Sequence, residues 1–98
     1  MFEVIQSETF RRWREGLKDR QALARVNARI RRLAEGNLGD VKFVRDGVSE
    51  LRVDYGPGYR VYFVRRGPLL LVLLAGGNKR TQDVDIKRAV ALAEDWKE

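Results

Sequence analysis

A run of consecutive apolar residues at 69–75 sets the strongest limit on how this chain of 98 residues can fold. The run is far shorter than the roughly 20 residues that a membrane-spanning helix needs. A strand built from it would be apolar on both faces, which is typical of a strand buried in the middle of a sheet. We expect this strand to end at Gly76-Gly77-Asn78, because paired glycines commonly break regular structure.

Three further segments alternate apolar and polar residues with the period of two that strands show. They cover residues 41–44, 48–55 and 59–65. Arg45-Asp46-Gly47 is a hairpin-turn signal between the first two segments, and Gly56-Pro57-Gly58 predicts the next turn. Short turns between successive strands indicate a four-stranded antiparallel meander that ends in the apolar strand.

Helical periodicity appears in three places. Residues Phe10, Trp13 and Leu17 predict a short helix with Ser7 as its N-cap, preceded by a possible strand over residues 2–5. A second helix fits residues 19–35, and a last helix fits about 81–96. The inner faces of these two helices would consist of Ala22, Leu23, Val26, Ile30, Leu33 and Ala34, and of Ile86, Ala89, Val90, Ala93 and Trp96.

These elements predict a single α+β domain over residues 1–98: an N-terminal strand, two helices, four strands and a C-terminal helix. The first two helices would form a hairpin with one apolar and one strongly basic face. We expect this hairpin and the last helix to cover the apolar face of the sheet. The other face would then be open, concave and polar, and we expect the functional site there.

The chain contains neither cysteine nor histidine. Disulfides, thiolate nucleophiles, Ser-His-Asp triads and zinc sites built from Cys or His are therefore excluded. Acidic residues show no metal-ligand spacing, and no phosphate-cradling glycine motif is present, so we expect no metal and no cofactor. The N-terminus lacks the basic and apolar regions of a signal peptide, so we expect a soluble, cytoplasmic protein without a membrane partner.

Positive charge is in excess and unevenly distributed. Lys and Arg number 20 against 14 Asp and Glu, a formal net charge of +6. Between Phe10 and Leu33 lie nine basic residues and two acidic ones. Nucleic acid, an acidic protein and an anionic membrane are the partners that such a balance allows. An ordinary solvated helix face is the alternative explanation for the basic segment.

The predicted meander would bring basic residues from different segments near one another. Arg52 lies in one strand, Arg60 begins the next, and Lys79 and Arg80 follow the apolar strand. Such a cluster suits phosphate, which arginine and lysine bind by charge and by directed N–H donors. The alternatives are that Arg52 pairs with a neighbouring acid, Glu50 or Asp54, and that Lys79 and Arg80 are simply exposed.

Aromatic residues among cations are typical of single-stranded nucleic-acid sites. Tyr62 would share the face of Arg60 and is the expected RNA-binding aromatic residue, whereas Tyr59 would share the face of Val61 and belong to the core. Further cations are expected to contact RNA on the strands and on the second helix. These are Lys42, Arg25, Arg29 and Arg32.

RNA cleavage needs no histidine, because the 2′-hydroxyl of RNA supplies the nucleophile. Fixed cations can stabilise the extra negative charge on phosphorus, and a lysine, tyrosine or carboxylate with a shifted pKa can move the protons. Asp83 and Asp85 are the carboxylates nearest in sequence to the cationic loop. Alternatively, both are ordinary favourable charges in the first turn of a helix.

Two strings, ELRVDYGPGYRVYF at 50–63 and LAGGNKRTQDVDI at 74–86, resemble the RelE/ParE toxin superfamily, and most closely its HigB-like branch of addiction module killer proteins. The resemblance spans nearly the whole chain. It implies the toxin of a bacterial type II toxin–antitoxin module. Most RelE-like and HigB-like members cut messenger RNA on the ribosome, and a partner antitoxin, commonly a helix-turn-helix protein of the HigA type, neutralises them.

The resemblance also implies site residues. Arg60 matches the arginine of the G-Y-R motif. Lys79 matches the basic residue after the central strand, with Arg80 as the alternative register. Arg52 matches the cation of the preceding strand approximately. The catalytic tyrosine position of the family falls on Asp85, which leaves the general acid and base unassigned.

Three functions remain open at this stage. The first is a metal-independent endoribonuclease that acts on the ribosome, with catalytic roles for Arg52, Arg60, Lys79 and Asp85. The second is a ParE-like poison that inhibits DNA gyrase by binding, and the third is an inactive nucleic-acid-binding module. An acidic segment of the antitoxin is expected to contact the basic protein, either at the helical hairpin or, as we expect, at the cationic cleft.

Overall fold

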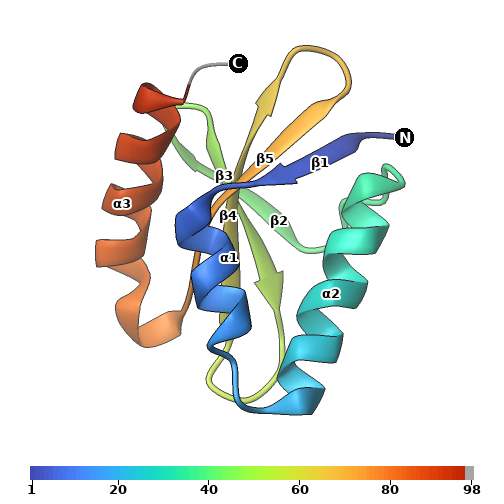
Figure 1. Cartoon of the computed structure of the whole chain (residues 1–98), viewed down its shortest axis with the longest axis vertical. Coiled ribbons are helices and arrows are strands. Elements are labelled where there is room, and N and C mark those ends of the chain that lie inside the picture. Colours follow the sequence, from blue (N-terminus) through green and yellow to red (C-terminus); the bar gives the residue numbers. More distant parts are fainter. Residues whose placement is uncertain (97–98) are drawn as a thin grey trace.

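The computed structural model describes residues 1–96, and the last two residues of the predicted domain lie outside this part. The α+β fold is confirmed: three α-helices accompany one five-stranded sheet (Figure 1). The strands are β1 (Glu3–Gln6), β2 (Val41–Arg45), β3 (Val48–Val53), β4 (Tyr59–Arg66) and β5 (Leu70–Asn78). The helices are α1 (Glu8–Glu15), α2 (Arg20–Ala34) and α3 (Gln82–Asp95), and a 3₁₀ turn over Lys79–Thr81 leads into α3.

The sheet is mixed, with the strand order β1-β5-β4-β3-β2. Strands β2 to β5 form the antiparallel meander, whereas β1 pairs in parallel with β5, Val4 lying opposite Leu71. The hairpin turn between β2 and β3 is present, with positive φ angles of 52° at Asp46 and 82° at Gly47. These angles match the turn that the Asp-Gly pair favours.

Local capping explains where the first two helices begin. The Ser7 hydroxyl accepts a hydrogen bond from the backbone N–H of Phe10, as expected, and also donates one to the carbonyl of Leu74. The Asp19 carboxylate accepts from the N–H groups of Gln21 and Ala22 at the start of α2. Both side chains satisfy N–H groups that a helix end leaves unpaired.

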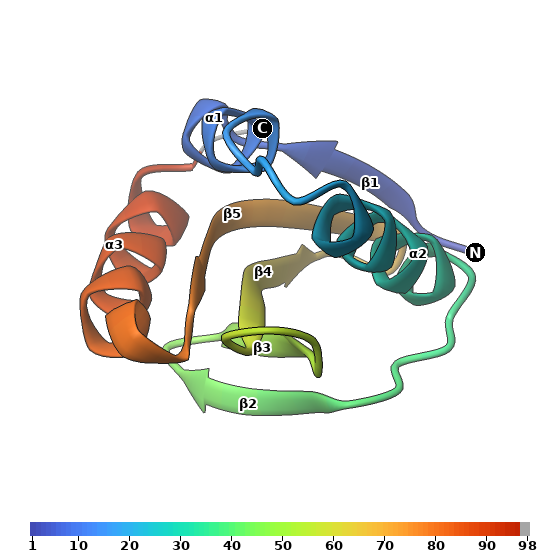
Figure 2. The same cartoon turned by 90° about the horizontal axis from the view of Figure 1, so that it is seen from below.

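Helices cover both faces of the sheet, which differs from the prediction that all three share one face. Figures 1 and 2 show α3 on one side of the strands and α2 on the other. The alternation in β4 explains the difference: Val61 and Phe63 belong to one apolar cluster, and Tyr62 and Val64 belong to a second. Because β5 is also apolar on both faces, each face needs its own helical cover.

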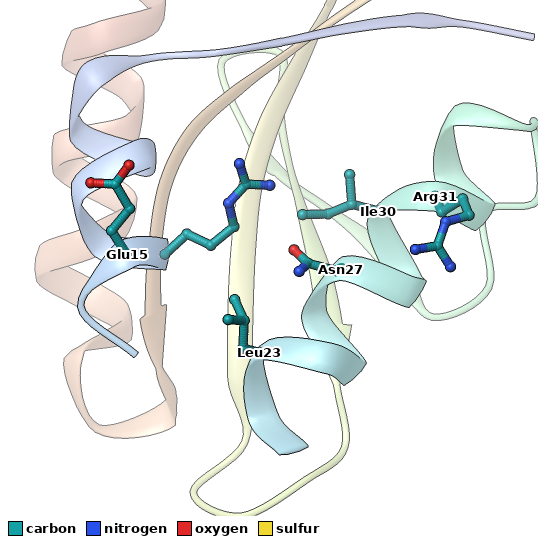
Figure 3. Close-up of a pocket in the computed structure, with 6 residues that line it drawn as sticks. Glu15, Leu23, Asn27, Ile30 and Arg31 are labelled. Carbon is teal, nitrogen blue, oxygen red and sulfur yellow. The ribbon is translucent and has the colours of Figure 1, made fainter. Parts of the chain in front are cut away.

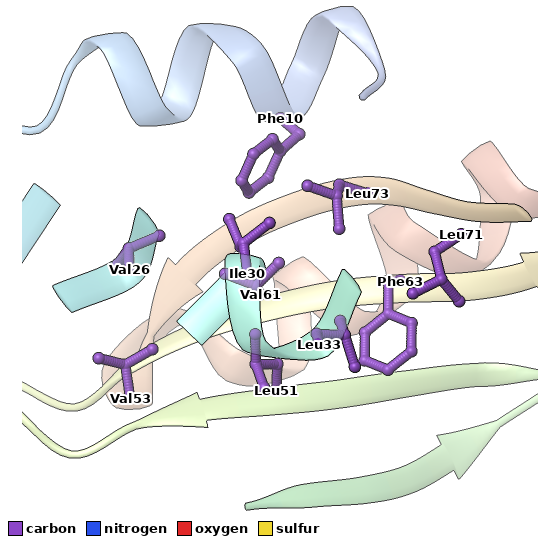
Figure 4. Close-up of a cluster of buried hydrophobic side chains, with 10 residues drawn as sticks. All are labelled: Phe10, Val26, Ile30, Leu33, Leu51, Val53, Val61, Phe63, Leu71 and Leu73. Atoms are coloured by element: carbon purple, nitrogen blue, oxygen red, sulfur yellow. The ribbon is translucent and has the colours of Figure 1, made fainter. Parts of the chain in front are cut away.

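The first cluster lies between the sheet and the helices α1 and α2, and Figure 4 shows its buried side chains. Phe10 of α1 and Val26, Ile30 and Leu33 of α2 contribute to it. The second cluster packs Ala89, Val90 and Ala93 of α3 against the opposite face. Ile86 and Trp96, which the helical pattern placed on the inner face of the last helix, pack partly buried against this second cluster.

The predicted helical hairpin takes the form of two helices on the same side of the sheet with a groove between them (Figure 3). The groove measures about 470 Å³ and is lined by Leu23, Asn27, Ile30 and Arg31 of α2 and by Arg14 and Glu15 of α1. On α1, the exposed Arg11 and Arg12 both pair with Glu8. For these two cations, the structure fits the solvated helix face that was the alternative explanation.

Strand β5 continues through Gly76, Gly77 and Asn78, so the prediction that the glycines end it is wrong. Glycine is needed at these two positions because a larger side chain would not fit, and not because the strand ends there. A Cβ atom at Gly76 would overlap the indole ring of Trp13 on α1, and one at Gly77 would overlap the carboxylate of Asp85 on α3. The two glycines therefore let elements on opposite faces of β5 approach its backbone closely.

We expect Gly76→Ala to lower the free energy of unfolding by about 1–3 kcal/mol, because the added methyl group must displace a packed indole ring. Chemical denaturation at neutral pH measures the change. Gly16→Ala, at the end of α1 with a φ of −82°, is the matched control and should change stability by about 1 kcal/mol or less. Equal stabilities for the two variants would contradict this account of Gly76.

Candidate functional site

Arg52, Arg60 and Lys79 line one pocket of about 360 Å³ at the end of the sheet where α3 begins. The sheet register explains the arrangement. Arg52 of β3 lies opposite Arg60 of β4, and Arg60 lies opposite Gly77 of β5, two residues before Lys79. The remaining lining residues are Asp40, Asp54, Gly56, Pro57 and Gly58. The structure thus brings together in one pocket three cations that lie in different segments of the sequence, as the predicted meander required.

Glu50 is the acid that holds two of these cations in place. Its side chain is 1% exposed, and its Oε2 atom lies 3.1 Å from Arg52 Nε and 3.7 Å from Arg60 Nε. Its Oε1 atom accepts a hydrogen bond of 2.6 Å from the side-chain amide of Gln82 at the start of α3. The alternative considered above, in which Arg52 pairs with a neighbouring acid, is therefore observed for Glu50.

The three cations differ in how much of them solvent can reach. The side chain of Arg52 is 35% exposed and that of Arg60 is 12% exposed, and Lys79 is exposed. Arg52 NH1 lies 3.9 Å from Asp40 Oδ1, and Arg60 NH1 donates a hydrogen bond to the carbonyl of Tyr59. Within residues 1–96, Lys79 makes no ion pair. The pocket therefore offers one free ammonium group beside two guanidinium groups oriented by Glu50.

The expected role of Tyr62 as an exposed RNA-binding aromatic residue is wrong, because its side chain is fully buried. It does lie on the face of Arg60, but α3 covers that face. Burial raises the pKa of Tyr62 above its ordinary value, and the nearby Glu50 and Asp85 carboxylates raise this pKa further. The hydroxyl has no hydrogen-bond partner among the described residues. Tyr59, in contrast, packs against the core as expected.

Asp85 does not line the pocket, so the expectation that it carries protons there is not supported by its position. Its side chain is buried against Gly77 in the first turn of α3, where it accepts a hydrogen bond from the Thr81 hydroxyl. Asp83 lies exposed in the same turn. This placement agrees with the alternative that both acids are favourable charges at a helix N-terminus.

The other predicted RNA-binding cations fall outside the main pocket. Arg80 is exposed in the 3₁₀ turn, and Lys42 is exposed on β2, across from Glu50. Arg25, Arg29 and Arg32 instead line a second pocket of about 250 Å³ together with Ala28, Val53 and Asp54. Because Asp54 lines both pockets, the two basic surfaces are adjacent.

The second pocket has one aromatic element at its edge. The guanidinium carbon of Arg25 lies 4.7 Å from the centre of the Tyr55 ring. The Tyr55 hydroxyl lies 3.3 Å from Asp19 Oδ2 and 3.3 Å from Gln21 Oε1, and it can donate its single hydrogen to either oxygen. Tyr55, which the sequence did not single out, is therefore the aromatic residue that stacks on one of the predicted RNA-binding cations, Arg25.

The sequence analysis did not identify Glu50 and Gln82 as functional residues. Glu50 was considered only as a possible partner of Arg52, although the two residues are two positions apart in one strand and therefore lie on the same face of the sheet. Gln82 carries no local signal, because its contact with Glu50 joins residues 32 positions apart.

Among residues 1–96, no group of His, Cys, Asp or Glu side chains is arranged to hold a metal ion. Within the same range, no helix has the length and apolar character needed to cross a membrane.

Comparison with known proteins identifies one informative relative. A Haemophilus influenzae protein, described only as uncharacterized, is 53% identical over 93 residues, which span 95% of this chain and 94% of the relative. The chain belongs to the family of this Haemophilus protein. No family model matches the chain. The high identity over almost full length indicates that the relative shares the fold described above.

We expect Tyr62→Phe to raise the free energy of unfolding by about 1 kcal/mol at neutral pH, because it removes a buried hydroxyl without a partner. The pKa of Tyr62 is raised in the folded state from its ordinary value of 10.0. The ionisation of Tyr62 therefore leaves the free energy of unfolding unchanged below pH 10.0 and lowers this free energy as the pH rises above 10.0. Chemical denaturation between pH 7 and pH 11 measures both effects. The variant should lose less stability at alkaline pH than the wild type, and an equal or larger loss would contradict this account.

Proposed function

We propose that this protein is the toxin of a type II toxin–antitoxin module, of the HigB-like branch of the RelE/ParE superfamily, and that it cuts messenger RNA on the ribosome. The observation that carries the proposal is the convergence of Arg52, Arg60 and Lys79 on one pocket. All three residues lie in the two strings that resemble the family, at 50–63 and 74–86. A pocket with three cations suits a phosphodiester group, to which arginine can donate two parallel hydrogen bonds.

The chemistry follows from the charges in the pocket. The 2′-hydroxyl of the bound RNA attacks the adjacent phosphorus, the P–O bond to the leaving 5′-oxygen breaks, and negative charge builds up on the phosphoryl oxygens. Arg60 and Lys79 stabilise this charge, which is commonly the largest contribution to catalysis, and Arg52 orients the phosphate. Asp40 and Asp54, the carboxylates that line the pocket, replace Asp85 as candidates for proton transfer.

Flanking nucleotides would lie along the second pocket. Arg25, Arg29 and Arg32 face it from one side of α2, and Asp54 joins it to the main pocket. Contacts between these arginines and the RNA backbone would add affinity without sequence preference. The ribosome and its messenger RNA are thus the proposed partners of the two basic surfaces.

A cognate antitoxin is the third proposed partner. The net charge of +6 favours association with an acidic segment. We place this segment over the main pocket, where it would block Arg52, Arg60 and Lys79 together. A helix-turn-helix protein is the type of antitoxin that the HigB-like resemblance implies.

One observation favours the second candidate function, a ParE-like toxin that inhibits DNA gyrase by binding. Glu50 neutralises part of the charge on Arg52 and Arg60, and the chain has no histidine to act as a base. A binding surface needs neither full charge nor a proton carrier. Intact transcripts and an induced DNA-damage response after expression would identify this function.

We expect Arg60→Ala and Lys79→Ala each to reduce RNA cleavage by about 100-fold or more, because each removes a cation that stabilises the transition state. Primer-extension mapping of cellular messages after brief induction measures cleavage, and growth measures toxicity. Arg88→Ala, which removes an exposed cation on α3 outside both pockets, is the matched control and should cut cellular messages as the wild type does. Full toxicity in both pocket variants would exclude the proposed mechanism.

A further inference from the structure

The buried position of Glu50 is hard to explain by charge alone. A carboxylate beside an anion-binding pocket opposes the binding of phosphate, and burying it costs free energy unless its oxygens are well paired. Both oxygens of Glu50 are paired here: Oε1 with the amide of Gln82, and Oε2 with Arg52 Nε and, more distantly, Arg60 Nε. The side chain therefore has the contacts of a fixed structural anchor between α3 and two strands.

The contacts of Glu50 involve only one edge of each guanidinium group. Both arginines face the carboxylate through Nε. Arg52 Nε donates a hydrogen bond to it, whereas Arg60 Nε is buried, makes no hydrogen bond among the described residues and contacts Glu50 as an ion pair at 3.7 Å. Within residues 1–96, no hydrogen bond uses the NH2 atom of either arginine. A guanidinium group has five N–H donors in a rigid plane, so fixing the Nε edge also fixes the direction of the donors that remain.

We infer that Glu50 is a positioning residue for an anion-binding site: it holds Arg52 and Arg60 so that their remaining N–H donors converge on a phosphate group in the pocket with Lys79. Gln82 in turn holds Glu50, so the start of α3 takes part in shaping the site. This inference rests on the proposed function for the identity of the ligand, a phosphodiester. It goes beyond that function in assigning a role to Glu50, an acid that lies in the string resembling the family but for which the resemblance implies no role.

The positioning role and simple electrostatics predict opposite effects for one substitution. Glu50→Gln keeps the size of the side chain and makes the protein more positive by one charge. Electrostatics alone predicts tighter binding of phosphate. Positioning predicts weaker binding, because glutamine offers one uncharged acceptor oxygen in place of two carboxylate oxygens. Its NH2 group must then face either the Gln82 amide or the Nε–H groups of Arg52 and Arg60, so the guanidinium groups lose their fixed orientation.

Titration of ¹⁵N-arginine-labelled protein with inorganic phosphate, followed by NMR, tests the inference. In the free wild type we expect a slowly exchanging Nε–H signal for Arg52, and we expect phosphate to shift the signals of Arg52 and Arg60. In Glu50→Gln the Arg52 Nε–H should exchange faster, and phosphate affinity should fall about tenfold, the loss of one charge-assisted contact. Asp54→Asn is the matched control: it removes an exposed carboxylate from the pocket rim and should tighten binding.

The outcomes separate this inference from the proposed function. Unchanged Nε–H exchange in Glu50→Gln, tighter phosphate binding by this variant, or absence of any phosphate effect on Arg60 in the wild type would each overturn the positioning role. A wild type that binds phosphate through both arginines but leaves transcripts intact would overturn only the nuclease. Circular dichroism establishes that Glu50→Gln folds.

If Glu50→Gln does not fold, Gln82→Ala provides the test. It removes the hydrogen bond to Glu50 Oε1 from a partly exposed position and leaves all charges unchanged. The positioning role predicts faster exchange of Arg52 Nε–H and weaker phosphate binding in this variant, and wild-type values for both would overturn it.

Discussion

Burial of β5 on both faces is the constraint from which the rest of this structure follows. The strand lies between β1 and β4, and its side chains enter two separate apolar clusters. Helices α1 and α2 cover one cluster and α3 covers the other. Burial of apolar surface is the main favourable term in folding, so a strand that is apolar on both faces requires helices on both sides. The layer arrangement is the direct result.

The position of the site follows from this arrangement. Helix α3 covers one face of the sheet and begins at the edge where Arg52 and Arg60 project. Gly77 lets Asp85 sit against β5, which brings the first turn of α3 close to the strands and Gln82 within reach of Glu50. Cations that would be scattered on an open sheet are gathered instead in a pocket between the strand ends and the start of the helix.

Glu50 shows how a small protein can keep two arginines side by side. Arg52 and Arg60 lie directly opposite each other on neighbouring strands, and like charges in such pairs destabilise a sheet. A buried carboxylate between them offsets this repulsion and fixes their orientation. The same contact lowers the net positive charge of the pocket, so the site depends on the direction of its donors as well as on the amount of charge.

The sequence by itself determined the element types, their order and most of their limits, because periodicity, caps and turn residues act over a few positions. It also indicated which cations share a pocket, since the strand register and the motif strings place Arg52, Arg60 and Lys79 at one end of the sheet. Only the tertiary structure decided that α3 covers the opposite face, that Tyr62 is buried, that β5 continues through Gly76 and Gly77, and that Glu50 meets Gln82. Each of these features depends on contacts between elements distant in sequence, and no local pattern records which face of a sheet a helix will cover.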